Sequence, residues 1–158
     1  MVTEDPMTGQ VGIALCVGVA ATVEDLTRRR ISNWIPLAAL AGGLVCQWMA
    51  RGWRGGVSGV LGAVAGFAVF LVFYWLGGMG GGDVKLMAGF GAVLGIERLW
   101  EAALWTAALG GLLAAGVLAV DALWRSLCKS KDGSQSPAFI PYAPAIALGA
   151  WLSLVPRP

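Results

Sequence analysis

The chain has 158 residues, of which 58% are hydrophobic and only 13% are charged, and its mean hydropathy is +0.74. Soluble domains are about 45–50% apolar and about 25% charged, so this composition excludes an ordinary soluble domain and indicates a polytopic membrane protein. The net charge of +2 comes from short basic clusters between apolar runs, a pattern typical of topology signals and not of a nucleic-acid surface. The absence of histidine excludes His-based triads and His-ligated metals, and three separated cysteines without a CxxC pair argue against zinc.

Six apolar segments predict an all-α membrane protein with about six transmembrane helices. We expect them to form a single domain over residues 1–158, without a separate soluble module. About 20 residues span the hydrocarbon layer; the third and fifth segments reach this length easily, and the first, second and sixth approach it. The segments are Met7–Val23, Trp34–Ala50, Val57–Leu76, Val84–Ile96, Ala102–Leu123 and Phe139–Val155.

The fourth segment is too short to cross a membrane alone, because it lies between Asp83 and Glu97. It would cross only if the glycine-rich stretch Gly77–Gly82 also lay at membrane depth. Non-helical backbone is tolerated there only where protein covers it or a wet cavity adjoins it. A lipid-facing charge costs about 2.5–3.5 kcal/mol or more. We therefore expect Asp83 in an enclosed, hydrated niche near one membrane face.

The distribution of basic residues predicts the orientation. With the N-terminus outside, the cytoplasmic loops carry seven basic residues and the outer loops four. The triplet Arg28–Arg30 after the first segment has the greatest weight in such a bias. This orientation places Asp25, Asp83 and the polar loop Cys128–Pro137 on the cytoplasmic side.

Asp25 and Asp83 are the candidate catalytic residues. Each also has a purely structural interpretation. Asp25 could be a charge at a helix end that the neighbouring arginines compensate, and Asp83 could be the N-cap of the fourth helix. The predicted topology puts both carboxyls at one depth, where two close carboxyls share a proton because both cannot ionise. One then acts as general base toward a water and the other as general acid toward a scissile carbonyl. The glycines Gly80–Gly82 would let an extended substrate backbone approach Asp83 without meeting a Cβ.

Several neighbours are candidates for supporting roles. Asn33 is expected to cap the helix that begins at Trp34. Lys85 would tune the charge of the carboxyl pair or hold a substrate carboxylate, or equally reach lipid headgroups. Pro141 and Tyr142 would either unwind the start of the last helix beside the site or form an ordinary proline-rich helix entry.

Three blocks of the sequence resemble a known family. Gly80-Gly81-Gly82-Asp83 fits the GxGD signature of intramembrane aspartyl proteases. The pattern Asp25-x-x-x-Arg29-x-Ile31-x-Asn33 and the stretch Ile140–Gly149 are similar to those of type IV prepilin peptidases. The blocks occur in that family's order and extend over nearly the whole chain.

The resemblance implies a bacterial inner-membrane enzyme that cuts the short basic leader from prepilin-like substrates at the cytoplasmic face. Asp25 and Asp83 would be its catalytic pair, with no cofactor or metal, and its partners would be prepilins or pseudopilins and lipid, not nucleic acid. Larger family members carry a tetracysteine zinc loop and N-methylate the new N-terminus. This chain lacks those features, so a peptidase without methyltransferase activity is predicted, similar to the small form of tight-adherence (Flp) pilus systems. The supporting or substrate-binding residues would be Gly80, Gly81, Gly82, Lys85, Arg29, Asn33, Pro141 and Tyr142.

Two other functions fit parts of the pattern. A small proton- or cation-coupled transporter could use Asp83 as its coupling residue, and an inverted repeat with a second interrupted segment would distinguish it. A non-catalytic assembly protein of a pilus or secretion machine is the other alternative, although the intact aspartates and glycine run give no reason to invoke a degenerate enzyme.

Overall fold

The computed structural model describes residues 6–77, 79–128 and 142–155, which form four α-helices and, within these ranges, no strand. The helices are α1 (Pro6–Arg28), α2 (Trp34–Trp75), α3 (Gly81–Cys128) and α4 (Ala143–Leu154). The prediction of an all-α fold is confirmed. Stretches of α1, α2 and α3 are long and apolar enough to cross a membrane, whereas α4 is a shorter apolar helix.

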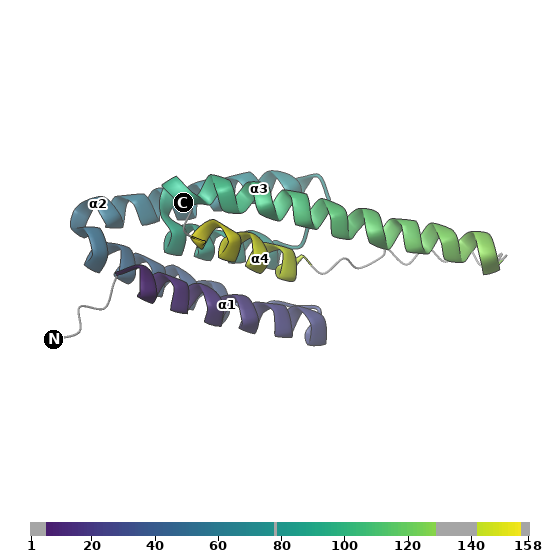
Figure 1. Cartoon of the computed structure of the whole chain (residues 1–158), viewed down its shortest axis with the longest axis horizontal. Coiled ribbons are helices and arrows are strands. Elements are labelled where there is room, and N and C mark those ends of the chain that lie inside the picture. The colour runs from purple at the N-terminus through teal and green to yellow at the C-terminus, as the bar shows by residue number, and fades with distance from the viewer. Residues whose placement is uncertain (1–5, 78, 129–141, 156–158) are drawn as a thin grey trace.

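Two glycines with positive φ divide the long helices. Gly52 (φ 57°) interrupts α2 and Gly95 (φ 73°) interrupts α3. At each break the chain folds back on itself, so that the second part of the helix returns in roughly the opposite direction (Figure 1). The helical parts before and after these breaks, together with α1 and α4, overlap the six predicted apolar segments. The number of membrane crossings stays a prediction.

The second part of α2 packs against the first part of α3 almost backbone to backbone. A Cβ added at Gly66 would lie 2.8 Å from the carbonyl oxygen of Met87, and one at Gly62 would meet the carbonyl oxygen of Gly91. Small residues permit this close approach of helices in lipid. The largest fully buried apolar side chains belong to one core cluster: Phe90, Leu86, Met87, Leu94, Leu99 and Ile146.

Polar side chains of α2 form hydrogen bonds with backbone groups on either side of the break at Gly95. Gln47, which is fully buried, donates from Nε2 to the carbonyl oxygen of Val93 over 3.1 Å. The hydroxyl of Ser58 accepts a hydrogen bond from the backbone N–H of Ile96 at 3.3 Å. Buried backbone groups without partners are costly, so these two contacts explain why polar residues occupy an apolar interface.

An arginine extends this polar contact to the surface. Arg51 donates from Nη2 to Oε1 of Gln47 over 2.9 Å and forms an ion pair with Glu97, with Nη1 and Oε2 2.8 Å apart. The two halves of the fold are thereby joined at the end where both long helices turn back.

The short helix α4 lies between α1 and α3 (Figure 1) and contacts both. The indole of Trp151 donates to the carbonyl oxygen of Ala14 on α1 over 2.9 Å. A Cβ at Gly149 would come within 2.8 Å of the carbonyl oxygen of Ala102 on α3. These contacts place the N-terminus of α4 beside the last turn of α1.

Candidate functional site

Asp25 and Asp83 are the buried charged side chains in the described part of the chain. Their exposed fractions are 5% and 7%, respectively. Asp25 lies in the last turn of α1, and Asp83 is the third residue of α3. Burial of a charged group costs free energy unless hydrogen bonds or charges compensate for it, so the surroundings of these carboxyls are informative.

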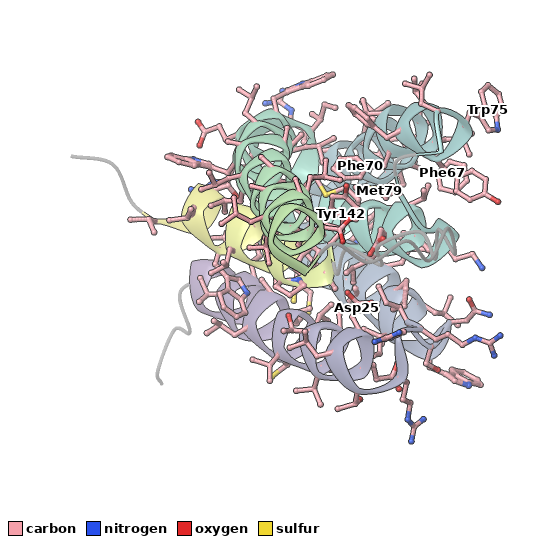
Figure 2. All side chains as sticks on the ribbon, turned by 90° about the vertical axis from the view of Figure 1, so that its right-hand side faces the viewer. Asp25, Phe67, Phe70, Trp75, Met79 and Tyr142 are labelled. Atoms are coloured by element: carbon pink, nitrogen blue, oxygen red, sulfur yellow. The ribbon has the colours of Figure 1, made fainter. Side chains whose placement is uncertain are left out.

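The carboxyl of Asp25 meets the start of α4. Its Oδ2 accepts a hydrogen bond of 3.2 Å from the backbone N–H of Ala143, which is itself fully buried. Ala143 is the first residue of α4, and the N-terminus of a helix carries unsatisfied N–H groups and a partial positive charge. Figure 2 shows Asp25 directed toward the interior of the helix assembly.

The carboxyl of Asp83 is held by the residue that precedes its own helix. Oδ2 accepts a hydrogen bond of 3.3 Å from the backbone N–H of Gly80, as an acidic residue at the third position does in a capping box. The interpretation of Asp83 as the N-cap was wrong in position, because α3 already begins at Gly81. Oδ1 is buried and has no hydrogen-bond partner among the described residues.

The fold places the two carboxyls on neighbouring helices. α1 contacts α3 directly, and Asp25 and Asp83 lie within range of an electrostatic interaction. In each carboxyl, one oxygen accepts a hydrogen bond from an uncharged backbone N–H, and no positively charged side chain takes part in either bond. The pair therefore forms a buried acidic centre with one oxygen of each group engaged by the backbone.

The glycines before Asp83 serve close packing. A Cβ at Gly82 would lie 3.2 Å from Cβ of Ile31, and one at Gly80 would lie 3.2 Å from Oδ2 of Asp83. A Cβ at Gly81 would make an ordinary contact, 3.6 Å from the ring of Tyr74. The space beside Gly82 is thus occupied by Ile31, which packs the turn after α1 against the start of α3.

Lys85 and Asn33 form an exposed contact at the same end of the fold. Lys85 Nζ donates to Oδ1 of Asn33 over 2.9 Å, which connects α3 to the turn between α1 and α2. The prediction that Asn33 caps α2 with its side chain was wrong: Asn33 stands at the N-cap position, but its side chain makes no capping hydrogen bond. The oxygen that would have capped the helix is engaged by Lys85.

The turn between α1 and α2 is shaped by Glu24 and Arg29. Glu24 accepts a hydrogen bond of 2.7 Å from the backbone N–H of Ser32. Arg29 has a φ of 52°, a left-handed conformation that is common where helices end, and its N–H bonds to the carbonyl oxygen of Asp25. Glu24 is thus engaged in the turn, while its neighbour Asp25 faces inward.

The last predicted block is seen in part. Tyr142 directly precedes α4 at its N-cap position. Pro141 and residues 129–137 of the polar loop lie outside the described residues.

The sequence did not reveal that Ala143 and Gly80 hold the two carboxyls. Both act through backbone N–H groups, which every residue except proline carries, so no side chain marks them. A capping-box spacing could have suggested Gly80, but no local pattern connects Ala143 with Asp25. No group of three or more Cys, Asp or Glu side chains is placed to hold a metal ion within the described ranges.

Comparisons with known proteins show to which family the chain belongs. The type IV leader peptidase family matches residues 12–115, a range that contains both aspartates and ends before α4. The Prepilin leader peptidase/N-methyltransferase of Bacillus subtilis (strain 168) is 37% identical over 77 residues, which are 49% of this chain and 27% of that protein. The chain thus aligns with only about a quarter of this relative, and no solved structure matches it significantly. Because the family match covers more than half of the chain, the chain belongs to the type IV leader peptidase family.

Proposed function

We propose that this protein is a membrane-embedded aspartyl endopeptidase that removes the N-terminal leader from prepilin-like substrates. The observation that carries the proposal is the pair of buried carboxyls, Asp25 and Asp83, each held by one backbone N–H. The family supports leader peptidase activity, and the apolar helices support a location in the membrane. The substrates are prepilins or pseudopilins.

The proposed reaction uses the two carboxyls as a base and an acid. One carboxylate takes a proton from a water while the oxygen of that water bonds to the scissile carbonyl carbon. The other carboxyl, which is protonated, gives its proton to the carbonyl oxygen, and a tetrahedral diol forms. A proton then passes to the leaving nitrogen, the C–N bond breaks, and the products are a leader with a new carboxyl and a mature chain with a new amine. The unpartnered Oδ1 of Asp83 supports this role, since it can accept a hydrogen bond from the attacking water.

We further propose that the site faces the cytoplasm of a bacterial inner membrane. The basic triplet Arg28–Arg30 begins three residues after Asp25, and Lys85 follows Asp83 by two residues. Basic residues concentrate in cytoplasmic loops, so this end of the helices is the one expected inside the cell.

We also propose that the protein has peptidase activity without N-methyltransferase activity, as in a small form of the family. The 158 residues contain three cysteines, too few for a tetracysteine metal site. Mass spectrometry of the mature pilin after co-expression tests this point. We expect an unmodified N-terminal amine, and a methylated one would contradict it.

The experiment that tests the peptidase is co-expression with a prepilin in membranes, with leader removal followed by gel shift. We expect Asp25→Asn and Asp83→Asn each to abolish cleavage while the protein still accumulates. The matched control is Glu24→Gln, which neutralises the adjacent carboxylate but keeps an acceptor for Ser32. Cleavage by either aspartate variant would overturn the proposal.

A further inference from the structure

A cavity of about 490 Å³ lies between the second part of α2 and the second part of α3, and Met79 and Tyr142, which precede α3 and α4, also line it. Its volume falls within the range of about 300–1,000 Å³ that is usual for ligand sites. Protein interiors are otherwise close-packed, with few voids larger than a water. The residues that line it are apolar or uncharged, and Phe70, Phe73, Leu104 and Trp100 form much of its wall.

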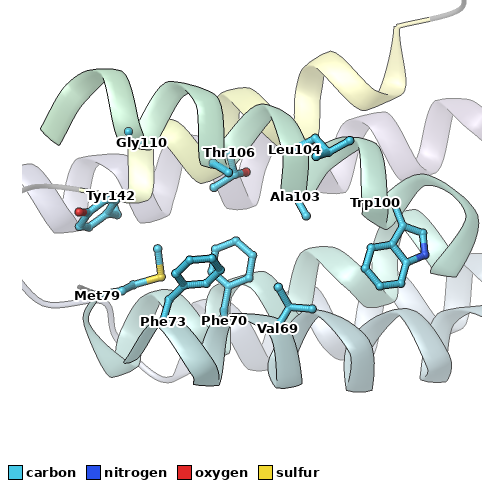
Figure 3. Close-up of a pocket in the computed structure, with 12 residues that line it drawn as sticks. Val69, Phe70, Phe73, Met79, Trp100, Ala103, Leu104, Thr106, Gly110 and Tyr142 are labelled. Atoms are coloured by element: carbon cyan, nitrogen blue, oxygen red, sulfur yellow. The ribbon is translucent and has the colours of Figure 1, made fainter. Parts of the chain in front are cut away.

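The cavity extends along the helices toward the carboxyl pair. Figure 3 shows Met79 and Tyr142 facing one another at one end and Trp100 at the opposite end. Met79 directly precedes Gly80, whose N–H holds Asp83. Tyr142 directly precedes Ala143, whose N–H holds Asp25. At this end of the cavity, Met79 and Tyr142 are therefore each adjacent in sequence to a residue whose backbone N–H holds one of the two carboxyls.

The cavity is accessible from the side of the helices that would face lipid. The exposed fractions of Phe73, Leu104 and Trp100 are 46%, 72% and 54%, although all three line it. A Cβ added at Gly111, on the same wall, would meet no atom within 4 Å. A bulky apolar group can thus enter laterally from the membrane.

The chemistry of the wall selects an apolar occupant. None of the described residues lining the cavity is charged. Thr106 is the buried polar residue of the wall, and its hydroxyl is directed at Gly149 of α4, where an added Cβ would collide with it. The wall therefore lacks the fixed polar partners that a charged or strongly polar ligand requires.

We propose that this cavity binds an apolar segment of the substrate next to the scissile bond, an inference that rests on the proposed peptidase function. A peptide accounts for both features of the cavity, because its apolar side chains fill the wall while its backbone continues past Met79 and Tyr142 to the carboxyls. A lipid acyl chain would fill the apolar space but would bring no amide to the acidic centre. The cavity residues then determine which substrates are cut.

The first test fills the cavity from α3. Gly111→Trp places a large ring where the structure has open space, and Gly116→Trp makes the same change on the same helix, outside the cavity and also without a neighbour within 4 Å. Cleavage of a full-length prepilin is measured in membranes at several substrate levels. We expect Gly111→Trp to raise KM about tenfold, equivalent to about 1.4 kcal/mol of lost binding, and Gly116→Trp to stay within about twofold of the wild type.

The second test detects the substrate without cleavage. A photoreactive phenylalanine analogue replaces Ala107, which lines the cavity, in the Asp83→Asn variant, and Ala115, which is exposed on α3 outside it, is the control position. We expect a covalent adduct with the same prepilin from position 107 and not from position 115. The adduct should map to an apolar segment of the prepilin next to the scissile bond.

The outcomes separate the two proposals. If the wild type cleaves the prepilin but Gly111→Trp cleaves it equally well, or position 107 gives only lipid adducts, the cavity proposal is overturned and the peptidase stands. If the wild type does not cleave, the peptidase proposal fails, and the cross-link still decides whether the cavity receives the prepilin. A lower cleavage rate for Gly111→Trp without an adduct at position 107 also overturns the cavity proposal.

Discussion

The backbone N–H of Ala143 donates a hydrogen bond of 3.2 Å to Oδ2 of Asp25, and it joins two residues 118 positions apart in the chain. This bond fixes the start of α4 to the last turn of α1. Ala143 is fully buried, so its N–H depends on a protein acceptor. The carboxyl proposed for catalysis is therefore also a structural acceptor, and the two roles can be separated by substitution.

We expect Asp25→Ala to destabilise the protein by about 1–3 kcal/mol, because it leaves a buried donor without a partner. Asp25→Asn keeps an oxygen that can accept the bond from Ala143, so its stability should stay within about 1 kcal/mol of the wild type. Unfolding in detergent, followed by tryptophan fluorescence, measures the difference. Equal stabilities for the two variants would show that the bond from Ala143 contributes little.

The break in α3 requires glycine for two reasons. Gly95 has a positive φ, and a Cβ there would lie 2.6 Å from Oγ of Ser58 and 2.8 Å from Nε2 of Gln47. Gly52 shares the positive φ but has no atom within 4 Å of the added Cβ. We expect Gly52→Ala to cost about 1–3 kcal/mol from backbone strain, and Gly95→Ala to cost clearly more. Thermal unfolding of both variants in detergent checks this order, and an equal loss would contradict the steric argument.

The contact between Gln47 and Val93 contributes to stability because it is buried. Gln47→Leu leaves the carbonyl of Val93 without its donor, and we expect a loss of about 1–3 kcal/mol. The ion pair between Arg51 and Glu97 is largely exposed, with side-chain exposures of 41% and 67%. Glu97→Gln should therefore cost only about 0–1 kcal/mol. Denaturant titration of both variants measures the contrast, and a larger loss for Glu97→Gln would reverse the assignment.

The contact between Lys85 and Asn33 offers a test of positioning beside the carboxyl pair. We expect Lys85→Met and Asn33→Ala each to lower prepilin cleavage about fivefold, since a hydrogen bond of this kind contributes about 1 kcal/mol. Because the two side chains act through one contact, the double variant should lose no more than either single variant. The initial cleavage rates of the wild type, the two single variants and the double variant are measured in membranes and compared as a double-mutant cycle. Additive losses would mean that the two residues act separately.

Much of the fold could be predicted from the apolar pattern, but the helix bounds could not. The fifth apolar segment was expected to begin at Ala102, whereas helix resumes directly after Gly95 and includes Glu97 and Arg98. The reason is that hydropathy measures the preference of side chains for lipid, whereas a helix continues wherever backbone hydrogen bonds can form. Charged residues end an apolar segment without ending a helix.

The sequence by itself determined the apolar, histidine-free character of this protein and the identity of its two candidate carboxyls. These are properties of side chains, and they can be read one residue at a time. Only the tertiary structure decided that Lys85, and not the helix backbone, engages the oxygen of Asn33, and that Ala143 and Gly80 hold Asp25 and Asp83. Nearly every residue carries the same backbone donor, so the partner of a carboxyl depends on which helix ends the packing brings together.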